Sequence, residues 1–146
     1  MTIQRYPCTC EARPRRTILL VEDEPFVREA TSRILQSVGF EVFPAADALE
    51  AMQVYDQLGR KADLLMTDVV LPGRSGHQLG QDLRNLSPGI AILLTSGYGE
   101  TGSDTESQEA RTYYLAKPYT KGSLVGKIEQ ILMATPLRRA AAQAGQ

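Results

Sequence analysis

Residues 17–25 read TILLVEDEP, a run of five strand-forming residues followed at once by three acids and a proline. The run is short and continuous, as expected for a strand that is covered on both faces of a sheet. Pro25 suits the first turn of a helix, where a backbone N–H has no partner within the helix. A strand that passes directly into a helix predicts an α/β fold.

The same unit recurs along the chain. Further strands are expected at 40–45, 63–67, 90–95 and 111–116, where apolar runs are bounded by turn residues. Helices are expected after four of the strands, with these apolar faces: Val27, Ala30, Ile34 and Val38; Ala48, Ala51, Met52, Tyr55 and Leu58; Leu79, Leu83 and Leu86; Leu124, Ile128, Ile131 and Leu132. This alternation predicts a parallel sheet with right-handed crossovers.

Residues 99–110 depart from the pattern. They occupy the place of a helix between the fourth and fifth strands, but they contain one Ala and no Leu, Ile, Val or Phe. Such a composition offers almost no face to bury against a sheet. We therefore expect the fourth helix to be short or disordered.

The length of 146 residues fits one domain with its own core. Residues 1–16 show no apolar period and are expected to form an N-terminal extension, with the folded domain at 17–133 and a C-terminal tail at 134–146. The extension contains Cys8 and Cys10. With only one histidine in the chain, the ligands are too few for a structural zinc site.

The charges of the chain nearly balance, with 16 basic and 17 acidic residues and a formal net charge of −1. This balance argues against a nucleic-acid partner, which would need a basic surface. The sequence contains no apolar run of membrane-spanning length and no hydrophobic signal core. We therefore expect a cytoplasmic protein with no membrane partner.

Polar side chains of complementary chemistry follow the predicted strands. Glu22 and Asp23 follow the first strand, Asp68 the third, Ser96 the fourth and Lys117 the fifth. The carboxyl ends of parallel strands meet at one edge of the sheet, so these side chains are expected together. Carboxylates, a hydroxyl and an ammonium there indicate a site for a divalent cation and a phosphoryl group.

Four sequence blocks carry a resemblance to a known family: VEDEP at 21–25, TDVVLPGRSG at 67–76, LTSGY at 94–98 and KPY at 117–119. In this order and spacing, residues 17 to about 133 resemble the receiver domain of bacterial two-component response regulators. The second and third blocks look most like receiver modules attached to hybrid histidine kinases. The resemblance implies a flavodoxin-like (βα)5 fold, a doubly wound parallel sheet of strand order 2-1-3-4-5.

The resemblance also implies roles for the acidic residues. Asp68 would be the phosphoacceptor, because a carboxylate can hold a phosphoryl group as a mixed anhydride. Mg²⁺ would be held by Asp23, by Asp68 and by the backbone carbonyl of Val70. Glu22 would bind the ion directly or through a water molecule, since its side chain is longer than the commoner aspartate.

The remaining roles concern the phosphoryl group and the response to it. Lys117 and Ser96 would contact the phosphoryl oxygens, and the Lys117–Pro118 bond is typically cis in this family. Ser96 and Tyr114 would form the switch that reports phosphorylation, with Tyr113 on the opposite face of its strand. His77, at the start of the third helix, is expected to be solvated.

The function expected from this resemblance is phosphorylation-dependent signalling in a two-component system, not conventional enzyme catalysis. The chain begins with Met and contains no kinase segment, so we expect a stand-alone regulator that is a monomer or weak dimer. Its expected partners are a sensor histidine kinase and a downstream protein. Three alternatives are a phosphorelay intermediate that serves a histidine phosphotransfer protein, a receiver that binds without phosphorylation, and a phosphatase of the haloacid-dehalogenase type. That phosphatase class needs a second aspartate where this chain has Val70.

Overall fold

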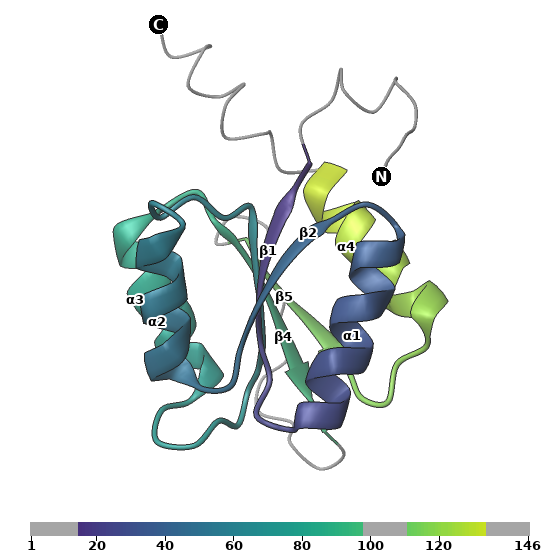
Figure 1. Ribbon diagram of the computed structural model, residues 1–146, viewed down its shortest axis with the longest axis horizontal. Coiled ribbons are helices and arrows are strands. Elements are labelled where there is room, and N and C mark those ends of the chain that lie inside the picture. The colour runs from purple at the N-terminus through teal and green to yellow at the C-terminus, as the bar shows by residue number, and fades with distance from the viewer. Residues whose placement is uncertain (1–14, 98–110, 134–146) are drawn as a thin grey trace, which may run out of the picture.

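The computed structural model of the protein describes residues 15–97 and 111–133. Figure 1 shows these elements, which are, in chain order, β1 (Thr17–Val21), α1 (Pro25–Ser37), β2 (Glu41–Ala45), α2 (Ala48–Gln57), β3 (Leu64–Asp68), α3 (Gly76–Leu86), β4 (Ala91–Ser96), β5 (Thr112–Ala116) and α4 (Lys121–Met133). The segment of the predicted fourth helix, nearly all of the predicted extension and the predicted tail lie outside the described residues. No helix in the described ranges is long and apolar enough to cross a membrane.

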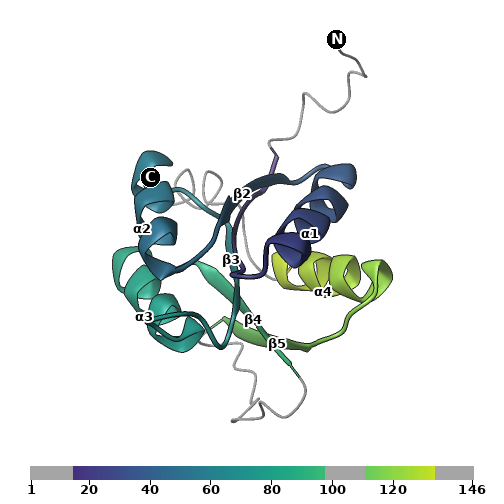
Figure 2. The ribbon, with the colours of Figure 1, turned by 60° about the horizontal axis from the view of Figure 1, so that its bottom comes forward.

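The strands form one sheet of order β2-β1-β3-β4-β5, with every neighbouring pair parallel, which confirms the predicted topology. Helices α2 and α3 cover one face of the sheet, and α1 and α4 cover the other (Figures 1 and 2). The bounds of β1 match the prediction, and β3 and β4 each lie one residue later than predicted. Asp68 and Ser96 are therefore the last residues of their strands.

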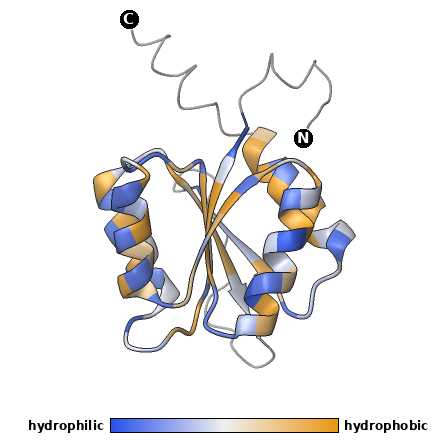
Figure 3. Cartoon of the chain, viewed as in Figure 1, coloured by the Kyte–Doolittle hydropathy of each residue, from blue (hydrophilic) through white to orange (hydrophobic). Residues whose placement is uncertain are grey.

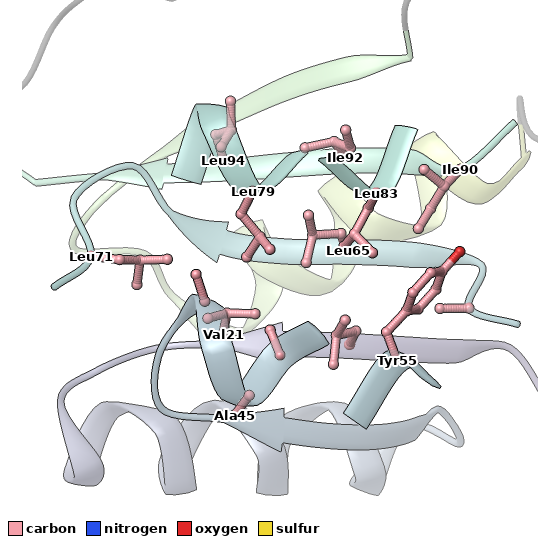
Figure 4. Packing of buried hydrophobic residues seen from close by; sticks show 14 residues of the cluster. Val21, Ala45, Tyr55, Leu65, Leu71, Leu79, Leu83, Ile90, Ile92 and Leu94 are labelled. Atoms are coloured by element: carbon pink, nitrogen blue, oxygen red, sulfur yellow. The ribbon is translucent and has the colours of Figure 1, made fainter. Parts of the chain in front are cut away.

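Side chains alternate between the two faces along each strand, so the sheet supports two cores. Figure 4 shows the core under α2 and α3, to which these residues contribute: Leu19, Val21, Tyr55, Leu65, Leu79, Leu83, Ile92 and Leu94. The core under α1 and α4 includes Ile18, Leu20, Leu35, Leu64, Met66, Leu93, Tyr113, Leu124 and Ile128. Figure 3 shows hydrophobic residues along the strands and both kinds of residue on each helix, as expected for helices with one buried side.

The predicted apolar face of α1 is confirmed only in part, since Ile34 packs against the core but two other predicted residues do not. Thr31 and Leu35 are buried, whereas Ala30 and Val38, which were expected in the core, are exposed. A threonine can occupy the core because its hydroxyl meets the Tyr119 hydroxyl, with an oxygen–oxygen distance of 3.0 Å. The partner lies 88 residues away in the sequence, so an apolar pattern within the helix does not reveal it.

The apolar faces of the other helices are closer to prediction. All four residues expected to be buried on α4 are buried. On α3, Leu79 and Leu83 are buried, while Leu86 ends the helix and is 39% exposed. Tyr113 and Tyr114 pack against opposite cores, which confirms the expected alternation along β5.

Two glycines allow α3 to approach the sheet closely. A Cβ atom on Gly76 would lie 2.0 Å from the backbone oxygen of Asp68, and the Gly76 N–H donates to the carbonyl of Val69 at 2.7 Å. A Cβ atom on Gly80 would lie 3.1 Å from Cδ1 of Ile92. The first turn of α3 therefore packs directly against the backbone of Asp68. Only a residue without a side chain permits this close approach.

Candidate functional site

The predicted acidic cluster forms at the carboxyl ends of β1 and β3. Glu22, Asp23 and Asp68 each place a carboxylate oxygen within 4.8 Å of the others. Charges at such a separation repel one another by a few kcal/mol at a dielectric constant of about 20. The cluster therefore needs a compensating positive charge.

Lys117 supplies part of that charge. Its ammonium nitrogen lies 2.6 Å from Oδ1 of Asp68 and 3.0 Å from Oε1 of Glu22. Burial alone would lower the pKa of Lys117, but hydrogen bonds to the two carboxylates outweigh burial and raise it. The Lys117–Pro118 bond is cis, as predicted, and the Lys117 N–H donates to the carbonyl of Ser96 at 2.8 Å.

Asp68 is buried, with 8% of its surface exposed. Its Oδ1 atom accepts a hydrogen bond from the Thr95 hydroxyl at 2.8 Å in addition to the contact with Lys117. Both of these donors therefore reach the same oxygen atom, Oδ1. Two donors on one oxygen atom restrict the orientation of the side chain.

Glu22 is more deeply buried than Asp68, at 4% exposed. Its Oε2 atom accepts the N–H of Glu24 at 3.2 Å, and its backbone carbonyl accepts from Arg28 at 2.8 Å. Burial, with the neighbouring Asp68 carboxylate, raises the pKa of Glu22 to about 7, and the ammonium of Lys117 opposes that rise. The charge of Glu22 is therefore sensitive to a change near neutral pH.

Asp23 is exposed, and it is the most accessible acid of the cluster. The side chain of Val70 is 58% exposed, two residues beyond Asp68 on the β3–α3 loop. Hard divalent cations prefer oxygen ligands, and Mg²⁺ is usually bound through one or two carboxylates together with water molecules. The convergent oxygen atoms of three acids, which Lys117 only partly neutralises, fit such an ion.

Ser96 is half-buried at the end of β4 and pairs with Ala116 in register. Strand alternation assigns its side chain to the face of Leu94, which is the face that also carries Tyr114. The Tyr114 hydroxyl lies 3.1 Å from Nε2 of His77, and the two rings are tilted with centroids 6.1 Å apart. His77 is exposed as predicted, but it also contacts the proposed switch residue.

Sequence reasoning missed Thr95 and the contact made by His77. The sequence offered a hydroxyl residue at the end of the predicted fourth strand, but its pairing with Asp68 depends on the register of β3 and β4, in which the two residues are partners and share a face. The His77 contact joins residues 37 positions apart on a helix and a strand, and no local pattern encodes it.

Comparisons with known proteins agree with this geometry. A family model described as the response regulator receiver domain matches residues 18–129. The chain is 36% identical over 117 residues to the sensor kinase CckA of Brucella abortus, a match that covers 80% of this chain and 12% of that kinase.

Two solved structures are also similar. The receiver domain of the hybrid histidine kinase CckA has a TM-score of 0.68 at 31% identity, covering 80% of this chain and 98% of that one. The response regulator TrrA of Thermotoga maritima, crystallised with Mg²⁺ and BeF, has a TM-score of 0.68 at 29% identity, with the same coverage of both chains.

Proposed function

Since the chain belongs to the family of response regulator receiver domains, we propose that Asp68 accepts a phosphoryl group from the phosphohistidine of a sensor histidine kinase. The observation that carries the proposal is the buried Asp68 carboxylate, with an ammonium 2.6 Å from Oδ1 and two further acids beside it. We place the receiver domain at 17–133, of which the family model covers 18–129.

The proposed reaction begins with the orientation of Asp68. Oδ1 is held by Lys117 and Thr95, so Oδ2 attacks phosphorus. The bond between phosphorus and the donor imidazole breaks, and its electron pair leaves with the donor nitrogen. Lys117 lies close enough to stabilise the transferred oxygens by charge.

We propose that Mg²⁺ is held by Asp23 and Asp68, with the backbone carbonyl of Val70, and that Glu22 contacts it directly or through water. When bound, Mg²⁺ neutralises charge on the phosphoryl oxygens and offsets repulsion within the acidic cluster. Asp23 is the most available ligand because it is exposed, whereas both oxygens of Glu22 already accept hydrogen bonds.

The phosphorylated state then acts on the protein surface through Ser96 and Tyr114. The backbone of Ser96 is linked to that of Lys117, because the Lys117 N–H donates a hydrogen bond to the Ser96 carbonyl. Leu94, two residues before Ser96, is the register partner of Tyr114. We propose that phosphorylation shifts the population of Tyr114 orientations and so changes the surface offered to a downstream protein.

Incubation with Mg²⁺ and acetyl phosphate, followed by intact mass measurement, tests the proposal. We expect the mass of one phosphoryl group to be gained, no gain in the presence of EDTA, and none in Asp68→Asn. Asp63→Asn is a matched control, because Asp63 lies just before β3, at the opposite end from Asp68, where it accepts the N–H of Thr17 at 2.8 Å. Hydroxylamine-sensitive label that persists in Asp68→Asn would refute the assignment.

The alternative of onward transfer uses the same acyl phosphate. It is distinguished by adding a histidine phosphotransfer protein to the labelled, donor-free chain. Rapid appearance of label on the added protein would identify a phosphorelay intermediate, whereas retention of label on the chain would support a terminal regulator.

A further inference from the structure

β4 ends in two adjacent hydroxyl residues that serve opposite faces of the sheet. Ser96 stands where the family resemblance expects a hydroxyl for the phosphoryl group, and alternation assigns it to the face of Tyr114. Thr95 belongs to the other face, with Leu93, and is 2% exposed. Its hydroxyl reaches the Asp68 carboxylate itself, so the two residues have different targets.

The Thr95 hydroxyl has one proton and two acceptors within range. Oδ1 of Asp68 lies at 2.8 Å, and the backbone carbonyl of Thr67 lies at 3.5 Å. The carboxylate is both nearer and charged, so it takes the hydrogen bond. Because both residues are almost fully buried, water cannot readily replace this donor.

We propose that Thr95 shortens the lifetime of the phosphorylated state, an inference that rests on the proposed function of Asp68. After transfer, Oδ2 carries the phosphoryl group, and Oδ1 is the carbonyl oxygen of an acyl phosphate. A hydroxyl donates more strongly to a carboxylate oxygen than to that neutral carbonyl. Thr95 therefore favours the carboxylate over the phosphorylated form.

The breakdown step shows why this preference affects a rate. Water attacks phosphorus, the bond between phosphorus and Oδ2 breaks, and its electron pair returns to the carboxylate. The proton released from water goes to phosphate or to solvent. Negative charge thus develops on Oδ1 and Oδ2 in the transition state, where the Thr95 hydrogen bond strengthens and lowers the barrier.

The chain contains a matched control for this threonine. Thr67 is the residue before Asp68, is 1% exposed, and faces the opposite core. Its hydroxyl donates to the backbone oxygen of Asp68 at 3.0 Å, not to the carboxylate. Thr67→Val therefore removes a buried hydroxyl beside the same aspartate without removing a donor to the reacting group.

The test follows loss of label after the full chain has been phosphorylated with acetyl phosphate and Mg²⁺ and the donor has been removed. We expect the phosphoryl half-life to lengthen by about three- to tenfold in Thr95→Val and Thr95→Ala, the size that loss of part of one charge-assisted hydrogen bond predicts. Thr95→Ser, which keeps the donor, should restore rapid decay. Thr67→Val should decay as wild type does.

Several results would overturn the inference. These are decay at the wild-type rate or faster in both Thr95→Val and Thr95→Ala, equal slowing in Thr67→Val, or a folded Thr95→Val that accepts no phosphate. The last result would mean that the Thr95 hydroxyl is needed for Asp68 to accept the phosphoryl group, not for the loss of that group. Failure of the proposed function looks different, because wild type would then take up no label or Asp68→Asn would take up as much as wild type.

Discussion

The two faces of the sheet differ in what they carry at the site edge. On the α1/α4 face, alternation brings Glu22, Asp68, Thr95 and Lys117 together, and their contacts are short, charged and largely buried. On the α2/α3 face, the corresponding contact is a hydrogen bond between the hydroxyl of Tyr114 and an exposed histidine. The proposed phosphoryl chemistry therefore lies on one face and the proposed response on the other.

Under the proposed function, a signal that starts at Asp68 has to cross the sheet to reach Tyr114. Successive side chains of a strand project to opposite faces, so the proposed coupling would use the backbone at the strand ends. Two such connections are described. The Lys117 N–H donates to the carbonyl of Ser96, and Gly76 at the start of α3 packs closely against the backbone carbonyl of Asp68. The α1/α4 face is held by charged, largely buried contacts, whereas the hydrogen bond between Tyr114 and His77 on the other face is exposed.

The largest effect is expected on the α1/α4 face, from Lys117→Met. Loss of the ammonium should lower the rate of phosphorylation by acetyl phosphate by about a hundredfold, as removal of one preorganised charge donor typically does. Lys127→Met is the matched control, because Lys127 is on the same side of the sheet with its ammonium 5.8 Å from the centre of the Tyr113 ring. Equal losses in the two variants would mean that net charge, not the position of Lys117, matters.

The next effect concerns the attachment of α3 to the site. Gly76→Ala forces a methyl group to within 2.0 Å of the backbone oxygen of Asp68, so helix or strand must move. We expect a loss of about 2–3 kcal/mol in the free energy of unfolding, measured by urea denaturation. Gly80→Ala should lower the free energy of unfolding by less, because its methyl group would lie 3.1 Å from the flexible end of the Ile92 side chain. Equal losses would show that the contact with Asp68 has no special cost.

The third effect is the pH dependence of Mg²⁺ binding. Burial beside Asp68 raises the pKa of Glu22 to about 7, so a proton competes with the ion below that pH. The Mg²⁺ affinity should fall by up to about tenfold per pH unit below 7 and level off above it. Glu22→Gln should flatten this dependence on pH. Asp23→Asn should weaken Mg²⁺ binding at pH 8 more than Glu22→Gln does, but its affinity should change with pH as that of wild type does. A slope in Glu22→Gln equal to that of wild type would contradict the assignment.

The same raised pKa has a consequence for the stability of the metal-free protein. The folded state keeps a proton on Glu22 at pH values where the unfolded chain, with a pKa near 4.5, has released it. The stabilisation contributed by this group is therefore fully present below pH 4.5 and is lost as the pH rises through about 7. Thermal unfolding of wild type and Glu22→Gln across this range measures the contribution directly.

The sequence predicted the sheet better than it predicted the helix faces and side-chain contacts. Alternating elements and handed crossovers predicted a parallel sheet, and the family resemblance supplied its strand order. Part of the buried face of α1 was missed because the Thr31 hydroxyl has its partner, Tyr119, in a loop far away in the sequence. The acids and Lys117 could be placed at one edge by topology alone, but the contact of Thr95 with Asp68 needed the register of two strands. Long-range partners of this kind become visible only when the chain is folded.

The smallest effect is expected on the α2/α3 face, where the hydrogen bond between His77 and Tyr114 is partly exposed. A double-mutant cycle with His77→Ala and Tyr114→Phe should give a coupling of about 0.5 kcal/mol in the free protein. The cycle cancels the effect of the alanine on helix propensity as well as any other contact that Tyr114 makes. If phosphorylation moves Tyr114, the coupling should vanish when the cycle is repeated with Mg²⁺ and beryllofluoride bound. A coupling of the same size in both states would show that Tyr114 keeps its contact with His77, and the α2/α3 face would then take no part in the response.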